Sequence, residues 1–343
     1  MSVRSAQGGR QRGFSLIEFM VAMTLGLILI AGAVTVYLAT KRSYTEVEQV
    51  ASLAENSRFG LQVLNDSLRH AGFFGGAHPR DIQPDSALGI VTGDCTGDAS
   101  SLNVDSYLRA VAPTTAVVFG CITDALPVAG GVPRDVLVVK QVLPRPLYDR
   151  DPDDASAAVD GVISFPAALD AQETYIIANS ERGLLLDGAD TAPDVRPGNP
   201  YALAAAWPYR LHVYYIRDLA TPTLSRRVLS WDTAAGAMAM ATEDLVPGVE
   251  SLRFRFGVDA NGNGEVDRFM NVAQMTVNPM WDDVEAVEVS LLLRAPAEDI
   301  AYEDQKTYNV GGVAVTPGGN WRRQLVQTNV SLRNPKLMIR GGL

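Results

Sequence analysis

The stretch GFSLIEFMVAMTLGLILIAGAVTVYLA, from Gly13 to Ala39, decides the fold of this chain. Glu18 is the only charged residue between Phe14 and Ala39. A helix over these residues would measure about 39 Å, which exceeds the roughly 30 Å hydrocarbon core of a bilayer. The sequence therefore predicts a membrane-spanning helix, and a carboxylate inside such a helix is a functional hypothesis by default.

Positive charge precedes the apolar stretch. Arg4, Arg10 and Arg12 stand in the first thirteen residues, which contain no acidic residue. By the positive-inside rule this flank stays in the cytoplasm, so we expect everything after Thr40 to lie outside it. The stretch is too long for the apolar part of a secretory signal, and no small-residue cleavage site follows it, so we expect it to be retained.

The composition limits the classes of function. The chain has 343 residues, 47% of them hydrophobic, and a formal net charge of -10. This length suits one large domain or two ordinary ones. Phosphate binding needs clustered Lys and Arg, so we expect no direct contact with nucleic acid. No G-x-S-x-G, H-E-x-x-H, P-loop or Cys-x-x-Cys motif occurs, and we expect no enzymatic activity.

Helical periodicity continues beyond the span and then gives way to strands. Apolar residues recur at steps of three and four from Tyr44 to Ala71, and a glycine-rich stop follows. Beyond Gly76, short β-rich runs alternate with Gly, Pro and Asp. The expected strands are Ala116–Phe119, Val136–Val142, Thr174–Ala178, Tyr209–Arg217, Ser225–Trp231, Leu252–Val258, Val284–Leu293 and Gln327–Leu332. The sequence thus predicts an α+β fold, with a long transmembrane and then amphipathic helix packed on a mostly antiparallel sheet domain.

Two cysteines fit an exported domain. Cys95 and Cys121 are the only pair in the chain. In an oxidising compartment we expect them to form a disulfide, and two buried free thiols are the alternative. The bridge would close a loop of about 27 residues, which the chain-entropy model values at roughly 3.5 kcal/mol.

The sharpest local motif is DANGNGEVD, residues 259–267. Its oxygen-bearing side chains fall at the first, third, fifth and ninth positions of an EF-hand-type loop, with Gly264 at the sixth. The expected side-chain ligands of a calcium ion are Asp259, Asn261, Asn263 and Asp267. Glu265 would contribute its backbone carbonyl. Met270 stands where such a loop carries a bidentate Glu, and the alternative is a metal-free hairpin turn, for which NGNG is a strong signal.

The beginning of the chain resembles a type IV prepilin. A short basic leader ends in Gly13, Phe14 follows, and Glu18 lies inside the apolar helix. In that family a membrane peptidase cuts after the glycine and methylates the new N-terminal phenylalanine. The resemblance implies a cleaved cytoplasmic leader 1–13, a transmembrane helix 14–40, an amphipathic helix 41–72 that continues the stalk, and an exported β-rich pilin domain 73–343.

This resemblance offers a role for the charge in the membrane. Cleavage would leave a positive α-amine on Phe14, and Glu18 of one subunit could pair with that amine on a neighbour. A low dielectric makes such an attraction strong and penalises an unpaired partner. The pair would set the axial register of the helices. The alternative is that Glu18 lies near the membrane edge and snorkels toward water.

The large exported part looks like a minor pilin of the PilW type, on the segments DVLVVKQV (135–142) and QTNVSLRNP (327–335). The J-type minor pseudopilin of type II secretion is the alternative. The PilW resemblance implies an assembly role beside other minor pilins, the major pilin and a tip adhesin, in a complex that primes pilus growth. It also implies residence in the inner membrane with the domain in the periplasm, and then in the pilus. A tip domain whose loops bind a surface molecule is compatible with that role.

Overall fold

The computed structural model describes residues 13–154 and 156–334. The basic leader with Arg4, Arg10 and Arg12 lies outside the described residues, as does Pro335 at the end of the QTNVSLRNP segment. The chain divides into two compact units, Met1–Ala51 and Ser52–Leu343.

The described part of the first unit consists mainly of helix. Helix α1 spans Leu16–His70, so it begins in the first unit and ends in the second. Its apolar side chains in the first unit are exposed, with Phe14 at 90% and Leu29 at 73%. By length and composition α1 can cross a membrane. Apolar residues on all sides of an unburied helix are what a lipid environment requires.

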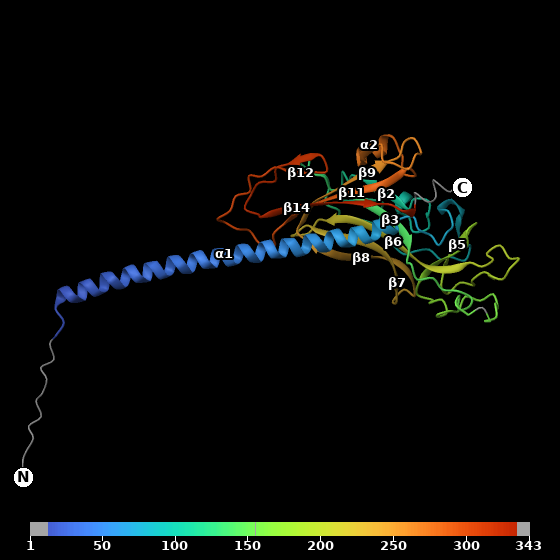
Figure 1. The fold of residues 1–343 in the computed structure, drawn as a ribbon, viewed down its shortest axis with the longest axis horizontal. Coiled ribbons are helices and arrows are strands. Elements are labelled where there is room, and N and C mark those ends of the chain that lie inside the picture. Colours follow the sequence, from blue (N-terminus) through green and yellow to red (C-terminus); the bar gives the residue numbers. More distant parts are fainter. Residues whose placement is uncertain (1–12, 155, 335–343) are drawn as a thin grey trace, which may run out of the picture. The chain divides into compact units, whose positions relative to one another are not determined.

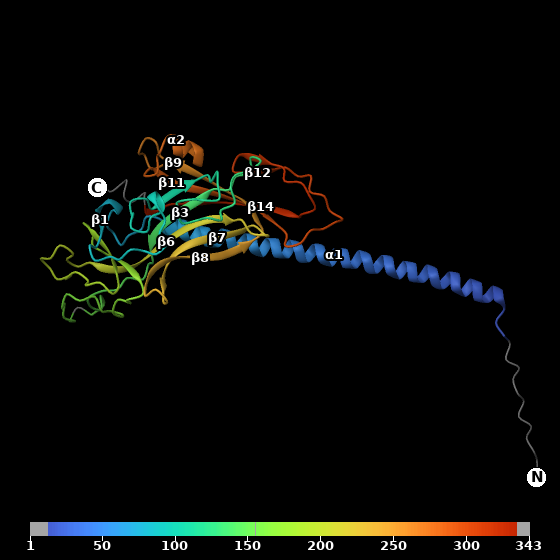
Figure 2. The ribbon, with the colours of Figure 1, turned by 180° about the vertical axis from the view of Figure 1, so that it is seen from behind.

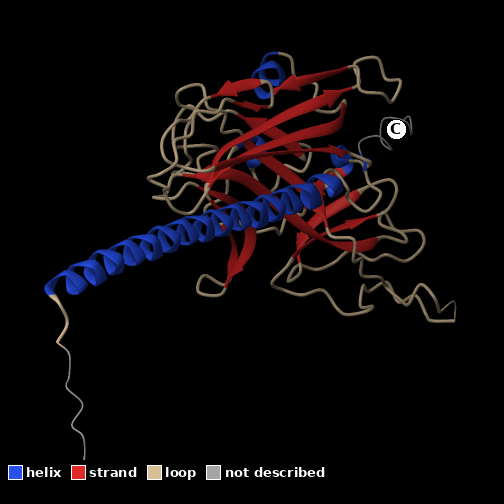
Figure 3. Cartoon of the chain, turned by 60° about the vertical axis from the view of Figure 1, so that its left-hand side comes forward, coloured by secondary structure: helices blue, strands red, loops and turns tan. Residues whose placement is uncertain are grey.

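The second unit is built mostly from strands (Figure 3). Its larger sheet has eight strands among the described residues, in the order β1-β5-β4-β6-β3-β2, and β7 and β8 join through β6. These strands are β1 Ile82–Pro84, β2 Leu108–Val111, β3 Val136–Val142, β4 Thr174–Ala178, β5 Gly183–Asp187, β6 Ala205–Arg217, β7 Thr223–Asp232 and β8 Ala237–Pro247. All its strand pairs are antiparallel except β1 with β5.

A second sheet of four strands has the order β10-β9-β11-β14. Its strands are β9 Val249–Val258, β10 Arg268–Asn271, β11 Val284–Arg294 and β14 Arg323–Ser331. A small hairpin pairs β12 Tyr308–Val310 with β13 Val313–Val315, and the short helix α2 Val272–Val277 follows β10. The expected α+β fold with a mostly antiparallel sheet is confirmed.

The part of α1 in the second unit packs on these sheets. Leu53, Leu64 and Leu68 are buried in the same core as the strands. At Gly60 the helix comes close to both sheets, since a Cβ there would lie 3.4 Å from Leu291 of β11 and 3.6 Å from Val246 of β8. Figures 1 and 2 view the structure from opposite sides, and in both this part of α1 runs alongside β6 and β8. The apolar stripe predicted from Tyr44 to Ala71 therefore reaches the core of the domain in its second half.

Seven of the eight expected strands coincide with or overlap observed strands. The expected strand Ala116–Phe119 is wrong. Only one isolated bridge, between Val118 and Ile122, forms there. Phe119 and Gly120 both have positive φ, 51° and 71°, so the chain turns back on itself immediately before Cys121. A strand cannot continue through two left-handed residues, although the run AVVF is rich in β-branched side chains.

Candidate functional site

The first turn of α1 holds the residues of the predicted processing and assembly site. Gly13 and Phe14 precede the helix and are exposed. The backbone N–H of Ser15 donates to Oε2 of Glu18 at 2.9 Å, and the backbone N–H of Glu18 donates to Oγ of Ser15 at 3.3 Å. This reciprocal pair is a capping box, which satisfies two N–H groups that a helix start leaves without partners.

Because of the capping box, the carboxylate of Glu18 already has a hydrogen-bond partner in its own chain. Its carboxylate lies in the first turn of the helix, where the helix dipole favours negative charge. Oε2 is held by the chain's own backbone, and within the part of the chain that the structure describes no group donates to Oε1. This contact was not predicted, although Ser15 and Glu18 stand at the S-x-x-E spacing that signals it.

Cys95 and Cys121 form the expected disulfide, which is therefore confirmed. The residue before the bridge organises the loop that the bridge closes. The carboxylate of Asp94 accepts hydrogen bonds from the backbone N–H groups of Cys95 and Ser101 and from the hydroxyls of Ser100 and Ser101. Strand β2 lies inside the same loop and pairs with β3. The loop is thus fixed to the large sheet as well as closed on itself.

Lys140 of β3 also joins this loop to the large sheet by hydrogen bonds. Its side chain is fully buried, and Nζ donates to the backbone carbonyls of Asp98 and Asn103. Burial lowers the pKa of Lys140 to about 7, against the opposing effect of the Asp98 carboxylate. Lys140 was not predicted as a structural residue. A lysine inside the apolar run VLVVKQV is nevertheless a signal, because an unpaired charge is rarely buried.

The loop 259–267 is closed by its own hydrogen bonds. The buried carboxylate of Asp259 accepts from the backbone N–H groups of residues 261, 262, 263 and 264. These bonds outweigh the effect of burial and lower the pKa of Asp259. Asp267 accepts from Ala260 and from the amide group of Asn261. The turn alternative therefore has a complete physical account without a metal.

The donor set remains compatible with a calcium ion. Asn261 and Asn263 each accept one backbone N–H through Oδ1, and an amide oxygen has two lone pairs. Among the described residues, Oδ2 of Asp259 accepts from Gly264, whereas Oδ1 takes the other three bonds. Within the described residues no group of three or more His, Cys, Asp or Glu side chains could hold a metal ion. Any cation here would therefore depend on amide and carbonyl oxygens beside two carboxylates.

A serine and a histidine also meet inside the second unit. Oγ of Ser67 on α1 lies 3.0 Å from Nδ1 of His212 and 2.6 Å from the hydroxyl of Tyr214, both on β6. Burial, with Arg226 and Arg210 nearby, lowers the pKa of His212 to about 3. A general base near neutral pH needs a pKa near the working pH. The contact joins α1 to the sheet rather than assembling a nucleophile.

Two family models match the chain. The first is the prokaryotic N-terminal methylation motif, over residues 8–34, which includes Gly13, Phe14, the capping box and the beginning of the apolar helix. A chain with this motif ahead of an exposed apolar helix and an α+β domain has the features of a membrane-anchored type IV pilin.

The second match indicates which type of type IV pilin the chain resembles. The model "Type IV Pilus-assembly protein W" matches residues 213–334, from within β6 through β14. Together the two matches support a type IV minor pilin of the PilW type, and the resemblance drawn from the sequence is confirmed. No curated protein and no solved structure matches the chain.

These matches define the role at a coarse level. They support a pilin role in a type IV pilus, and pilin-family domains are structural. The family implies contacts with other pilus components and with the prepilin peptidase that recognises the methylation motif.

Proposed function

We propose that this chain is a minor pilin that takes part in the initiation of pilus assembly and in the complex at the pilus tip. The observation that carries the proposal is the methylation motif at the start of an exposed apolar helix, joined to a domain that matches PilW-type proteins. The precursor resides in the inner membrane with its domain in the periplasm, and the processed subunit then enters the pilus. Its partners are other minor pilins, the major pilin and a tip adhesin.

Processing is the first step of the proposed pathway. The prepilin peptidase cuts between Gly13 and Phe14, both of which are exposed ahead of the helix, and Phe14 is then methylated. Mass spectrometry of the N-terminus from cells that make pili tests this step. A chain that begins at methylated Phe14 supports the proposal, and a chain that still begins upstream of Phe14 overturns it.

Glu18 sets the register of the subunit against its neighbours. In the single chain Oε2 of Glu18 is held by Ser15, which leaves Oε1 for the α-amine of Phe14 in an adjacent subunit. An amine and a carboxylate in a low-dielectric environment attract strongly when their geometry is good. The capping box holds the carboxylate in one position before the neighbour arrives, which lowers the entropy lost on pairing.

Two substitutions separate the charge from the cap. Glu18→Gln keeps an N3 side chain that can cap the helix but removes the negative charge, whereas Ser15→Ala removes the hydroxyl of the cap and keeps the charge. We expect Glu18→Gln to be processed normally and to be depleted from sheared pili, and Ser15→Ala to be incorporated. Immunoblots of membrane and pilus fractions measure both. Wild-type incorporation of Glu18→Gln would refute the pairing.

We also propose that calcium binds the loop 259–267, with Asp259, Asn261, Asn263 and Asp267 as side-chain ligands and Glu265 as a carbonyl ligand. The support is the spacing of the motif and the oxygen lone pairs that remain after the loop has closed. Asp267→Asn is the informative variant, because Asp259→Ala would also break the turn itself. We expect millimolar calcium, but not magnesium, to raise the melting temperature of the wild type more than that of the variant. No shift with calcium would remove the proposal.

A further inference from the structure

Two arginines near the end of α1 have side chains without a partner in the described part of the chain. Arg69 lies in the last turn of α1, and Arg333 follows the end of β14. Within residues 13–154 and 156–334 neither guanidinium group makes a hydrogen bond or a salt bridge. The side-chain amide of Asn334 donates to the backbone carbonyls of Arg69 and Ala71 at 3.5 and 3.3 Å. These contacts hold the segment that carries Arg333 against the end of α1, so the two positive charges border one space.

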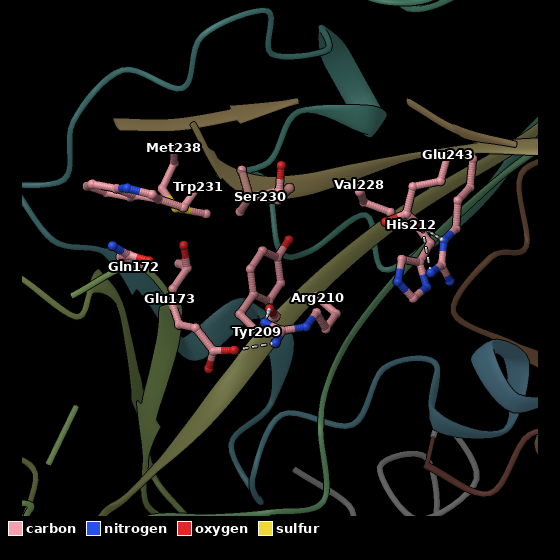
Figure 4. A pocket seen from close by; sticks show the side chains of 13 residues that line it. Gln172, Glu173, Tyr209, Arg210, His212, Val228, Ser230, Trp231, Met238 and Glu243 are labelled. Carbon is pink, nitrogen blue, oxygen red and sulfur yellow. Dashed lines mark hydrogen bonds and ion pairs between the residues drawn. The ribbon is translucent and has the colours of Figure 1, made fainter. Parts of the chain in front are cut away.

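Arginines elsewhere in the second unit commonly pair with carboxylates. In the cavity between β4, β6 and β7, Arg210 contacts Glu173 at 2.7 Å, as Figure 4 shows. Arg226 of the same lining contacts Glu243 at 2.7 Å. The whole chain carries a formal net charge of -10, so it has more carboxylates than cations. Two guanidinium groups left unpaired in such a chain are free to bind a carboxylate of another molecule.

Arg69 and Arg333 line a cavity of about 660 Å³, which we call the tail groove. Its lining includes Asp66, Arg69, His70, Asn329, Ser331 and Arg333. Asp66 is the one carboxylate among these residues, so the lining has an excess of positive charge. The imidazole of His70 donates through Nδ1 to the backbone carbonyl of Asp66 at 2.9 Å. The volume lies within the range of about 300–1,000 Å³ that is typical of ligand sites.

The backbone of β14 beside the groove also has unpaired groups. Within the described residues β14 is the last strand of its sheet and pairs with β11 alone. The N–H of Leu332 donates to the carbonyl of Glu285, and backbone groups alternate in direction along a strand. Asn329 and Ser331 therefore direct their N–H and C=O groups away from β11, and both residues line the groove. A strand edge with such unpaired groups is a template for another strand.

From this geometry we propose that the tail groove binds an extended acidic segment of another pilus subunit, which adds to the edge of β14 and places its carboxylates on Arg69 and Arg333. Backbone hydrogen bonds would supply affinity, and the two guanidinium groups would select acidic side chains at alternate positions of the added strand. A free anion would leave the strand edge unpaired, and a neutral strand would leave the arginines unpaired. The inference rests on the proposed function for the source of the segment, because a pilus subunit meets other subunits during assembly.

The test is a titration of the full chain, in micelles of an uncharged detergent, with the end-blocked peptide STVEVEVTS. Saturation-transfer NMR measures the binding, and we expect a dissociation constant of about 0.1–1 mM. The peptide STVQVQVTS has the same shape without the two charges and should bind at least about threefold more weakly. In STVEPEVTS the central proline prevents strand pairing, so this peptide should not bind measurably. Sodium phosphate at about 10 mM should not displace STVEVEVTS, because it cannot pair with the strand edge.

Variants of the protein test the same two kinds of contact. Arg69→Gln and Arg333→Gln should each weaken the binding of STVEVEVTS about three- to fivefold. The matched control is Arg182→Gln, since the guanidinium group of Arg182 also makes no contact within the described residues and lies outside the groove. This control should bind as the wild type does. Ser331→Pro removes an N–H that points away from β11, so it should weaken the binding and leave β14 paired. Circular dichroism shows whether each variant is folded, and the arginine variants serve if Ser331→Pro is not.

Several outcomes would overturn the inference. They are no binding of STVEVEVTS at about 5 mM, equal binding of STVQVQVTS, or wild-type binding by both arginine variants. Equal binding of STVEPEVTS, or displacement by phosphate, would also overturn it, because the groove would then hold an anion and not a strand. Failure of this test leaves the pilin role intact, since the titration does not require processing of the N-terminus. An uncut N-terminus, in contrast, would overturn that role and not the binding of the peptide.

Discussion

Reduction of the Cys95–Cys121 bridge should lower the stability of the second unit by an amount that its loop length predicts. The two cysteines are 26 positions apart, and for a loop of this length the chain-entropy model gives roughly 3.5 kcal/mol at 25 °C. The folded state should change little on reduction, because β2 and Lys140 hold the loop independently of the sulfur atoms. The effect therefore arises mainly in the unfolded chain, which gains conformational freedom.

Urea unfolding of the oxidised and the reduced wild type measures this difference without replacing any residue. All four tryptophans of the chain lie after Ser52, so their fluorescence reports on the second unit and not on the membrane helix. With a urea dependence of about 3 kcal/mol/M, the midpoint should fall by about 1.2 M. A loss below about 1 kcal/mol would refute the reasoning, because it would mean that the loop is already constrained when the chain is unfolded. The Cys95→Ala/Cys121→Ala variant under oxidising conditions is the control, and it should match the reduced protein.

Three further predictions concern single side chains. Lys140 has a pKa of about 7 in the fold against an ordinary value of 10.5, so between these pH values the unfolded chain binds the proton and stability rises with pH. In Lys140→Met the free energy of unfolding should lack this increase with pH. Urea midpoints measured between pH 7 and 9 check it. Gly60→Ala should stabilise the second unit by about 0.5–1 kcal/mol in the same assay, because Ala has a higher helix propensity than Gly. The new Cβ would lie 3.4 Å from Leu291, which is an ordinary van der Waals contact. Gly75→Ala should destabilise it by roughly 1–3 kcal/mol, because Gly75 has a φ of +68° and the new Cβ would lie 2.3 Å from Trp207.

The strands that the sequence predicts best are those in which every residue is buried. Val136–Val142 coincides with β3 and Thr174–Ala178 with β4, and both are buried along their whole length. Continuous apolar runs bounded by turn residues leave little ambiguity. Strand β8 was not predicted, because AMAMATEDLVP combines small, flexible and acidic residues of low β-propensity. The strand forms because it pairs with β7 over ten positions.

Long-range contacts explain why the candidate sites were only partly predictable. The spacing of Gly13, Phe14 and Glu18 is local, and so is the motif at residues 259–267. The pairing of β4 and β7 with successive parts of the same edge of β6 is a consequence of sheet order and has no local signature. Lys140 was visible as an anomaly, but its partners lie 42 and 37 positions away along the chain.

The capping box bears on how strongly Glu18 can steer assembly. If a bare carboxylate waited in the membrane for its partner, pairing would recover the large cost of an unsatisfied charge. In this chain the backbone N–H of Ser15 already donates to Oε2, so the neighbour's amine adds one bond at Oε1 to a carboxylate that is already partly satisfied. A hydrogen bond to a charged group contributes about 1.5–3 kcal/mol, which is a factor of roughly 10–150 in an equilibrium constant. An effect of this size per subunit selects the register without making a single contact irreversible, and it accumulates because each added subunit contributes both an amine and a carboxylate.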